Sequence, residues 1–275
     1  LNRLLRMNQH TPAAGATTWG ANNKTDDYRE EIRYDGNGNI LSYFRNGVNT
    51  TSTAMDNLKY FYPRDSKGKL IGNTLSYISD DVSDNAYPSD IDNMSSDNYK
   101  YDKIGNLISD KSANITAINW SVYGKIKSIT FSDNSSLSYK YDATGNRVYK
   151  EYTKSNITTK TWYLRDPQGN VLSVYGNNGG AQTFWKEQHL YGSSRLGMFV
   201  PEIQLTGTPG DAKVVWNQSN RLRYELTNHL GNILATISDQ PSTIYNMTDY
   251  APFGMQQVGR SYSLSGGYRY GFNGK

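Results

Sequence analysis

The sequence predicts an all-β protein, a long curved antiparallel sheet built from consecutive β-hairpins. Three observations predict this fold: a short phrase recurs along the chain, its flanks alternate between apolar and polar residues, and the composition favours strands and turns. Tyrosine accounts for 23 of the 275 residues and glycine for 25. Tyrosine suits half-buried strands and glycine suits tight turns, so both abundances fit a sheet with many reversals.

The recurring phrase has three close copies, YDGNGN, YDKIGN and YDATGN. The residues that these copies share are Tyr34, Asp35, Gly38, Asn39, Tyr101, Asp102, Gly105, Asn106, Tyr141, Asp142, Gly145 and Asn146. Looser copies surround five further glycines, and the residues marked in them are Gly68, Gly124, Gly169, Asn170, Gly197, Gly231 and Asn232. The marker glycines are about 20 residues apart at their closest, which indicates a repeat architecture with insertions.

Each part of the phrase has a local physical reason. The aspartate can accept hydrogen bonds from backbone N–H groups two or three residues ahead, which nucleates a turn. The glycine can take a positive φ, the following asparagine tolerates turn conformations, and the tyrosine helps to set the strand face. Alternating residues precede and follow the turn at Gly145, so the phrase predicts strand, turn and strand. A single hairpin is only marginally stable in water, but a series of hairpins that pair edge to edge can form a stable sheet. Eight phrases give roughly 16 strands at two strands each.

Along the chain, three regions differ. Residues 1–33 match the phrase poorly and form a lead-in, residues 34–222 carry the hairpin sheet, and residues 223–275 change in character. Residues 79–100 are an acidic insertion whose aspartates raise the alternative of a calcium site. The stretch has no glutamate for the last position of an EF-hand loop, so a solvated loop is the favoured interpretation.

The charge pattern excludes several classes of function. The net charge is +4, from 29 basic and 25 acidic residues without a basic block, so nucleic acid is not an expected partner. No apolar run is long enough to cross a membrane, and the absence of cysteine excludes thiolate sites. The adjacent pair Glu30 and Glu31 does not indicate a glycosidase, because neighbouring strand residues point to opposite faces. We expect no catalytic, cofactor-binding or metal-binding residue.

The last region carries three ordered landmarks, YELTNHLGN, DYAPFGM and YRYGFNGK. The residues marked in them are His229, Asp249, Pro252, Phe253, Gly254, Gly271 and Phe272. From the turn chemistry alone, His229 is expected at a turn or strand end. Pro252 is expected at a strand start, an edge or a bulge, because it cannot donate to a ladder.

Together with the repeated phrase, these landmarks resemble the YD repeats and the Rhs-associated core domain of Rhs proteins, the wall-associated relatives and the C component of insecticidal Tc toxins. The resemblance covers the chain from about Tyr34 onwards. It implies a β-cocoon, a shell of spiralling sheet that holds a C-terminal toxin segment. In many relatives an Asp-Pro-x-Gly element allows self-cleavage after the core. The sequence reaches Lys275 before such an element, and Asp166-Pro167 stands in an ordinary repeat phrase, so cleavage would depend on residues beyond Lys275.

The resemblance therefore implies a non-catalytic shell segment of a secreted or surface-delivered polymorphic toxin. Its expected partner is the protein's own C-terminal effector segment, and secretion machinery is a further candidate. Further repeats are expected before Leu1. The alternative is an adhesin on the bacterial cell surface that recognises glycans or proteins. Aromatic residues that could stack on sugars are Trp162, Tyr163, Phe184, Trp185 and Tyr191.

Overall fold

The computed structural model describes residues 2–12, 15, 18, 23–48, 52–82, 87–88, 90–240, 243–264 and 267–274. The predicted all-β class is confirmed: antiparallel strands make up nearly all of the regular structure in this part of the chain. The chain divides into two compact units, which are described separately. Unit 1 comprises Leu1–Ala113 and Tyr250–Gly259, and unit 2 comprises Asn114–Asp249 and Arg260–Lys275. The division of the chain into residues 1–33, 34–222 and 223–275 is based on the repeated phrases of the sequence, and it stays a prediction.

Unit 1 contains a five-stranded antiparallel sheet in the order β1-β2-β3-β4-β5, followed by the hairpin β6–β7. The strands are β1 (Arg6–His10), β2 (Lys24–Tyr34), β3 (Ile40–Asn46), β4 (Ala54–Phe61), β5 (Tyr77–Asp80), β6 (Tyr99–Tyr101) and β7 (Leu107–Asp110). One face of the sheet buries the cluster Ile32, Tyr43, Leu58 and Ile78. Alternate residues of a strand point to one face, so this cluster gives the sheet a true hydrophobic core.

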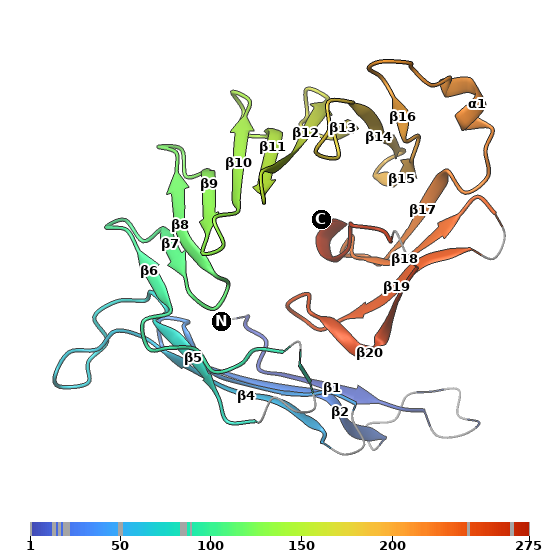
Figure 1. Cartoon of the computed structure of the whole chain (residues 1–275). Helices are drawn as coiled ribbons and strands as arrows, with labels where there is room; N and C mark the ends of the chain where they lie inside the picture. The colour runs from blue at the N-terminus through green and yellow to red at the C-terminus, as the bar shows by residue number, and fades with distance from the viewer. Residues whose placement is uncertain are drawn as a thin grey trace. The chain divides into compact units, whose positions relative to one another are not determined.

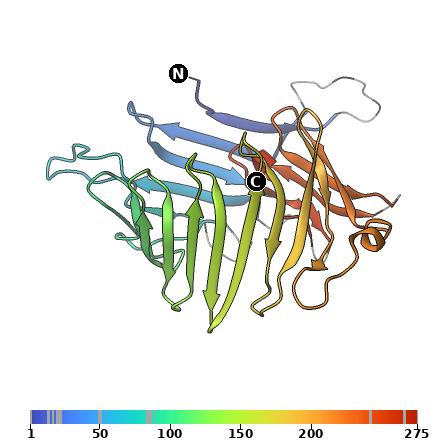
Figure 2. The ribbon, with the colours of Figure 1, turned by 90° about the horizontal axis from the view of Figure 1, so that it is seen from above.

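Unit 2 is a second antiparallel sheet, and its strands pair almost entirely in chain order (Figure 1). From one end its order is β8-β9-β10-β11-β12-β13-β14-β15-β17-β18-β19, with the short β16 paired to β14. The strands are β8 (Ile115–Trp120), β9 (Ile126–Phe131), β10 (Ser136–Tyr141), β11 (Arg147–Lys154), β12 (Ile157–Arg165), β13 (Val171–Gly176), β14 (Phe184–Tyr191), β15 (Arg195–Phe199), β16 (Ile203–Gln204), β17 (Leu222–Thr227), β18 (Ile233–Ser238) and β19 (Ile244–Tyr250). Figure 2 shows the strands from green to orange standing side by side.

The remaining elements are short or lie at the division between the units. The helix α1 (Ala212–Trp216) begins after Asp211, whose side chain accepts a hydrogen bond from the Lys213 amide, as expected of an N-cap. The strand β20 (Gln256–Ser263) follows β19, and the 3₁₀ turn η1 (Phe272–Gly274) stands near the C-terminus. Among the described residues, no helix is long and apolar enough to cross a membrane.

Three sequence-based expectations need correction. The phrase at Gly68 forms a turn with a single bridge, Arg64 to Leu70, and no flanking strands. Gly197 is not a turn residue: it lies inside β15, and a side chain there would meet the Arg223 carbonyl at 1.9 Å. A glycine is required at position 197 because the neighbouring strand β17 approaches the backbone closely, and not because the chain reverses there. Pro252 lies within a turn, as described below, and not in a strand.

The described residues form 20 strands, more than the roughly 16 expected. The strands β1, β4, β5 and β16 have no phrase of their own, and the landmark DYAPFGM provides a further turn between β19 and β20. The sheet also reverses at turns without a marker glycine. The turn between β11 and β12 consists of Ser155 and Asn156, with φ of 49° and 64°. Positive φ at both central residues matches the twist of the flanking strands.

Candidate functional site

The phrase turns share one hydrogen-bond pattern, seen at Asp142. Its amide donates to the Asn146 carbonyl (2.9 Å), and the Gly145 amide donates back to the Asp142 carbonyl (3.1 Å). The Asp142 carboxylate accepts from the amides of Thr144 and Asn146, both at 2.9 Å. Hydrogen bonds, first from the Thr144 side chain and then from the Asn146 amide, lower the pKa of Asp142. The carboxylate therefore organises the turn in its ionised form.

The same pattern recurs at the phrases of Gly38, Gly68, Gly105, Gly169 and Gly231. In the Asp102 turn, the Ile104 and Asn106 amides donate to the carboxylate at 3.0 and 2.9 Å, and the Asn106 side chain donates to its other oxygen at 2.9 Å. Each marker glycine of these turns has a positive φ, between 78° and 96°. The turns built this way end at Asn39, Lys69, Asn106, Asn146, Asn170 and Asn232, and Asp166 of the Asp-Pro pair belongs to the turn that ends at Asn170.

The geometry differs in detail from the sequence argument. The aspartate accepts amides two and four residues ahead, and not those two or three ahead. The sequence predicts only that the final asparagine tolerates turn conformations. In several copies its side chain also donates a hydrogen bond to the aspartate. In the phrase before Gly231, Asn228 occupies the aspartate position and accepts the same two amides at 3.0 Å.

Phrase tyrosines bond to an earlier hairpin, a role that sequence reasoning missed. The Tyr141 hydroxyl donates to the Ile126 carbonyl (2.8 Å), and Ile126 comes two residues after the marker Gly124. Tyr62 donates in the same way to Ile40, two residues after Gly38, and Tyr191 donates to Val171, two residues after Gly169. We call these the tyrosine–carbonyl bonds. A constant offset from the marker glycine is the sequence signal that could have predicted them.

The landmarks near residue 230 come together in unit 2. Asn232 is buried, and its side-chain oxygen accepts the Asn273 amide at 2.9 Å. The Ile233 amide donates to the Gly271 carbonyl at 3.1 Å, which places Gly271 and Phe272 beside the turn at Gly231. His229 is exposed at the tip of this turn. The landmark YRYGFNG therefore docks onto the start of β18.

The DYAPFGM landmark is a turn of the same bonding pattern. The Ala251 amide donates to the Met255 carbonyl (2.8 Å), the Gly254 amide donates to the Ala251 carbonyl (2.9 Å), and Gly254 has a φ of 92°. Pro252 stands in the second position of this turn. Phe253 packs edge-to-face on Tyr43 in unit 1, with ring centroids 5.8 Å apart.

Asp249 belongs to unit 2, where it forms an ion pair with Arg260 at 2.5 Å. The marked landmarks therefore do not gather in one site. They divide between the docking of residues 267–274 onto β18 and the turn that carries Phe253.

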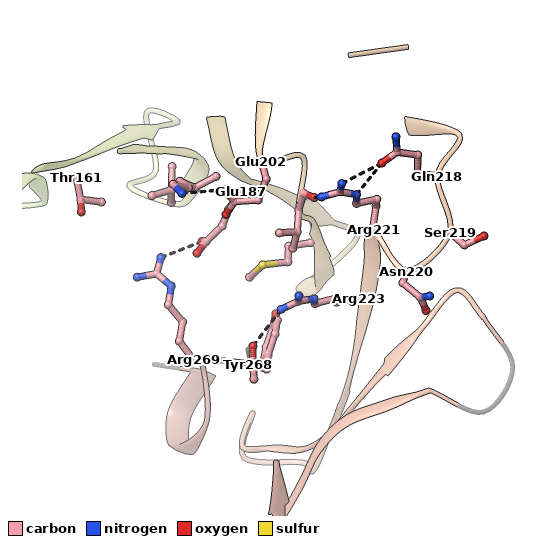
Figure 3. A pocket seen from close by; sticks show the side chains of 15 residues that line it. Thr161, Glu187, Glu202, Gln218, Ser219, Asn220, Arg221, Arg223, Tyr268 and Arg269 are labelled. Atoms are coloured by element: carbon pink, nitrogen blue, oxygen red, sulfur yellow. Dashed lines mark hydrogen bonds and ion pairs between the residues drawn. The ribbon is translucent and has the colours of Figure 1, made fainter. Parts of the chain in front are cut away.

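A cavity of about 700 Å³ opens in unit 2 (Figure 3). Strands β12 to β15 provide one side of it, residues 218–223 the other, and residues 267–269 run along its edge. We call residues 267–274 the C-terminal segment. Four cationic side chains and two carboxylates line the cavity: Lys186, Arg221, Arg223, Arg269, Glu187 and Glu202.

The C-terminal segment is held over the sheet by two carboxylates. Arg269 donates to Glu187 (2.9 Å), and the Tyr270 hydroxyl donates to the same oxygen (3.0 Å). Tyr268 donates to Glu225, which also accepts from Arg195 at 2.8 Å. These contacts join residues far apart in sequence, so no local pattern announced them.

The environment of Glu187 fixes its charge. Burial raises its pKa, but the hydrogen bond with His189 and the charge of Arg269 outweigh burial and lower the pKa to about 2. His189 Nε2 lies 3.1 Å from the carboxylate. An ionised carboxylate paired with an arginine cannot act as a general acid near neutral pH.

The other charged residues of the cavity are also engaged. Lys186 pairs with Glu202 at 2.7 Å, and Arg223 donates to the Gly267 carbonyl at 3.0 Å. Arg221 donates to Gln218 at 2.9 and 3.1 Å (Figure 3). These contacts fix the positions of the donors and acceptors that line the cavity. The expectation of a non-catalytic protein stays a prediction.

The insertion 79–100 lies in unit 1, and its residues 83–86 and 89 are outside the described residues. Ligand oxygens of Asp56, Asp80 and Asp90 come within 4.8 Å of one another. Arg45 already pairs with Asp56 at 2.7 Å, and Asp80 accepts the Asn57 amide at 2.8 Å. Burial, then the charge of Asp56, raises the pKa of Asp90 to about 6. The calcium alternative stays untested, with an arginine supplying part of the countercharge.

No protein-family model matches the sequence, and the curated proteins give no match. Solved structures do match. One is TcdB2-TccC3 without its hypervariable C-terminal region, with a TM-score of 0.50, 16% identity, and coverage of 92% of this chain. Another is the TcdB2-TccC3 crystal structure, with a TM-score of 0.44, 14% identity and 99% coverage. The chain spans 13% and 17% of the lengths of these two proteins. At such identity the likeness is one of fold.

Proposed function

We propose that the chain is a non-catalytic wall segment of a toxin shell, which encloses an effector segment of the same protein. The observation that carries the proposal is the repeated unit of the sheet. Several hairpins are closed by an aspartate or asparagine turn. Successive strands are joined by ladder pairing, and three tyrosine–carbonyl bonds add contacts between hairpins. Such a sheet grows by adding hairpins and needs no central core.

Sequence and fold support the proposal independently. The YD phrase and the ordered landmarks resemble Rhs proteins and the C component of Tc toxins, whose repeats form a shell. The fold is similar to part of TcdB2-TccC3, of which the chain spans a small share. A secreted or cell-surface location and a role within a larger toxin complex follow from this proposal.

A shell wall needs backbone groups that are satisfied within the sheet and side chains that tolerate an enclosed chain. In unit 2 the strands pair with one another from β8 to β19, which satisfies the first requirement. The cavity beside the C-terminal segment supports the second, because its charged and amide groups can hydrogen-bond to a polypeptide.

The experiment uses the full-length protein, including any residues that follow Lys275. We expect limited proteolysis, followed by mass spectrometry, to recover a C-terminal fragment that co-purifies with this chain and resists protease. The control is Asp166→Asn, which should leave any fragment unchanged because Asp166 belongs to a turn. If the effector fragment is digested as fast in the full-length protein as it is alone, the shell proposal is wrong. A surface anchor directly after the core would instead favour the adhesin alternative.

A further inference from the structure

Aromatic and lysine side chains form a continuous row across four strands of unit 2. Lys140 of β10 is the ladder partner of Tyr149 in β11, Tyr149 is the partner of Trp162 in β12, and Trp162 is the partner of Tyr175 in β13. Ladder partners lie side by side on one face of a sheet, about 5 Å apart. The row therefore follows the direction across the strands.

A groove of about 570 Å³ runs along this row. On β12 it is lined at alternate positions by Lys160, Trp162 and Leu164, which share one face of the strand. Trp162 is 36% exposed and Leu164 is 52% exposed, so no other part of the described chain covers them fully. The Trp162 ring lies 5.7 Å from the Tyr149 ring, and contiguous exposed apolar surface of this kind can mark a ligand-binding groove.

The groove is separate from the cavity beside the C-terminal segment, since the two share no lining residue. Val174, the neighbour of Tyr175 in β13, lines the cavity instead. Neighbouring strand residues point to opposite faces. Hence the groove and the cavity lie on opposite faces of β13, and a segment held in the cavity would not occupy the groove.

The charge of the groove is positive. Lys140 and Lys160 line it, and none of its lining residues is acidic. The Lys140 ammonium lies 5.2 Å from the centre of the Tyr149 ring, and within the described part of the chain it forms no ion pair with a carboxylate. The Lys160 ammonium lies 3.9 Å from Glu151, and its side chain is largely accessible. Glu151 stands at the margin and accepts the Tyr149 hydroxyl at 2.6 Å.

We propose that this groove binds an acidic oligosaccharide, one built from uronic acids. The C–H faces of sugar rings can stack on Tyr149, Trp162 and Tyr175, and the carboxylates can pair with the two lysines. Glu151 offers an acceptor for sugar hydroxyl groups. A single-stranded nucleic acid also stacks on aromatic rings, but it needs a positively charged groove that follows its backbone, whereas this groove is lined by two lysines. The inference does not rest on the shell function.

The test is titration of the chain with a short oligogalacturonate, followed by tryptophan fluorescence and calorimetry. We expect saturable binding that weakens as salt rises. Trp162→Ala should weaken binding at least about tenfold, and Trp162→Phe should retain most of it. Lys140→Ala and Lys160→Ala should each weaken binding by a few-fold. Tyr123→Ala is the control, because Tyr123 is an 86% exposed aromatic residue outside the groove.

The proposal is overturned if the wild-type chain does not bind oligogalacturonate, or if Trp162→Ala binds as well as the wild type. Equal binding of a neutral cello-oligosaccharide would contradict the acidic ligand. Tighter binding of oligo(dT) would replace the sugar by a nucleic acid. Circular dichroism of each variant shows whether the sheet is intact, and Trp162→Phe covers the case in which the alanine variant does not fold.

Discussion

The sheet β1–β5 of unit 1 and the strands β8–β12 of unit 2 are both antiparallel, but they bury different amounts of side chain. In unit 1, Leu58 is completely buried within an aliphatic and aromatic cluster. In the fully described strands β8–β12, the buried side chains are those of Ile118 and Tyr163. Most other residues there are half-buried.

The strands β8–β12 have other stabilising contacts in place of a core. Arg147 lies over the rings of Tyr139 and Tyr163, with its guanidinium 5.3 and 5.2 Å from their centres. Arginine over an aromatic face contributes on the order of 0.5 to 1 kcal/mol at an exposed site. The phrase turns and the tyrosine–carbonyl bonds add contacts at the strand ends. The comparison teaches that one sheet is stabilised through its centre and the other hairpin by hairpin.

The largest expected difference concerns core truncation. Leu58→Ala should lower the free energy of unfolding of unit 1 by about 2 to 5 kcal/mol, because it leaves a cavity in a closed core. The matched change in unit 2 is Ile129→Ala in β9, whose residue is half-buried between Ile118 and Leu137. Its cost should be about 1 kcal/mol. Urea unfolding of both variants measures the difference, and equal costs would break the comparison.

A smaller effect isolates the phrase turn. Gly124 has a φ of 69° with open space around it, so Gly124→Ala tests backbone conformation alone. We expect a loss of about 1 to 2 kcal/mol, confined to the hairpin β8–β9. Gly36→Ala is the control, since Gly36 also faces open space but has no positive φ in the left-handed range. The turn account fails if the two variants lose the same stability in thermal unfolding.

A tyrosine hydroxyl tests the joining of hairpins. Tyr141→Phe removes the hydrogen bond to the Ile126 carbonyl and should cost about 0.5 to 1.5 kcal/mol. Tyr152→Phe in β11 changes a tyrosine of the same hairpin for which the structure gives no hydroxyl bond within the described residues. Chemical denaturation of both variants gives the comparison. An equally large loss of unfolding free energy in Tyr152→Phe would show that the tyrosine–carbonyl bond does not contribute to the joining of hairpins.

The pH dependence of the unfolding free energy tests a buried carboxyl group of unit 1. The pKa of Asp90 is raised from 3.8 to about 6, first by burial and then by Asp56 and Asp92. The folded state therefore favours the neutral acid, whose contribution is complete below pH 3.8 and is lost as the pH rises through 6. Asp90→Asn should remove this loss. Unfolding free energies across that range should show a gap between variant and wild type that widens with pH, whereas a constant gap would refute the assignment.

Local chemistry explains what the sequence could predict. An aspartate and a glycine at fixed spacing specify a turn through contacts within a few residues, so the turn at Gly145 follows from its own phrase. Gly197 was misassigned because a glycine required by a neighbouring strand looks the same in sequence as one required by a turn. The turn at Ser155 and Asn156 has no glycine and therefore carried no marker.

The contacts of the candidate site were beyond local reasoning. Glu187 meets Arg269 only after many strands have been laid side by side, and the pairing depends on the register of each. The aromatic row is different, because each of its residues is a ladder partner of the next. The sequence identified Trp162 as a candidate for stacking, but the register was needed to place Tyr149 and Tyr175 beside it.

Native-state hydrogen exchange of the intact chain tests the central claim most directly, namely that the β8–β12 region is stabilised hairpin by hairpin. We predict that the amides of β2–β4 exchange together, in one cooperative opening, because they share a core. The amides of β8–β11 should instead show separate opening free energies for each hairpin. A single opening of β8–β11, with the same free energy throughout and equal to that of β2–β4, would contradict the account.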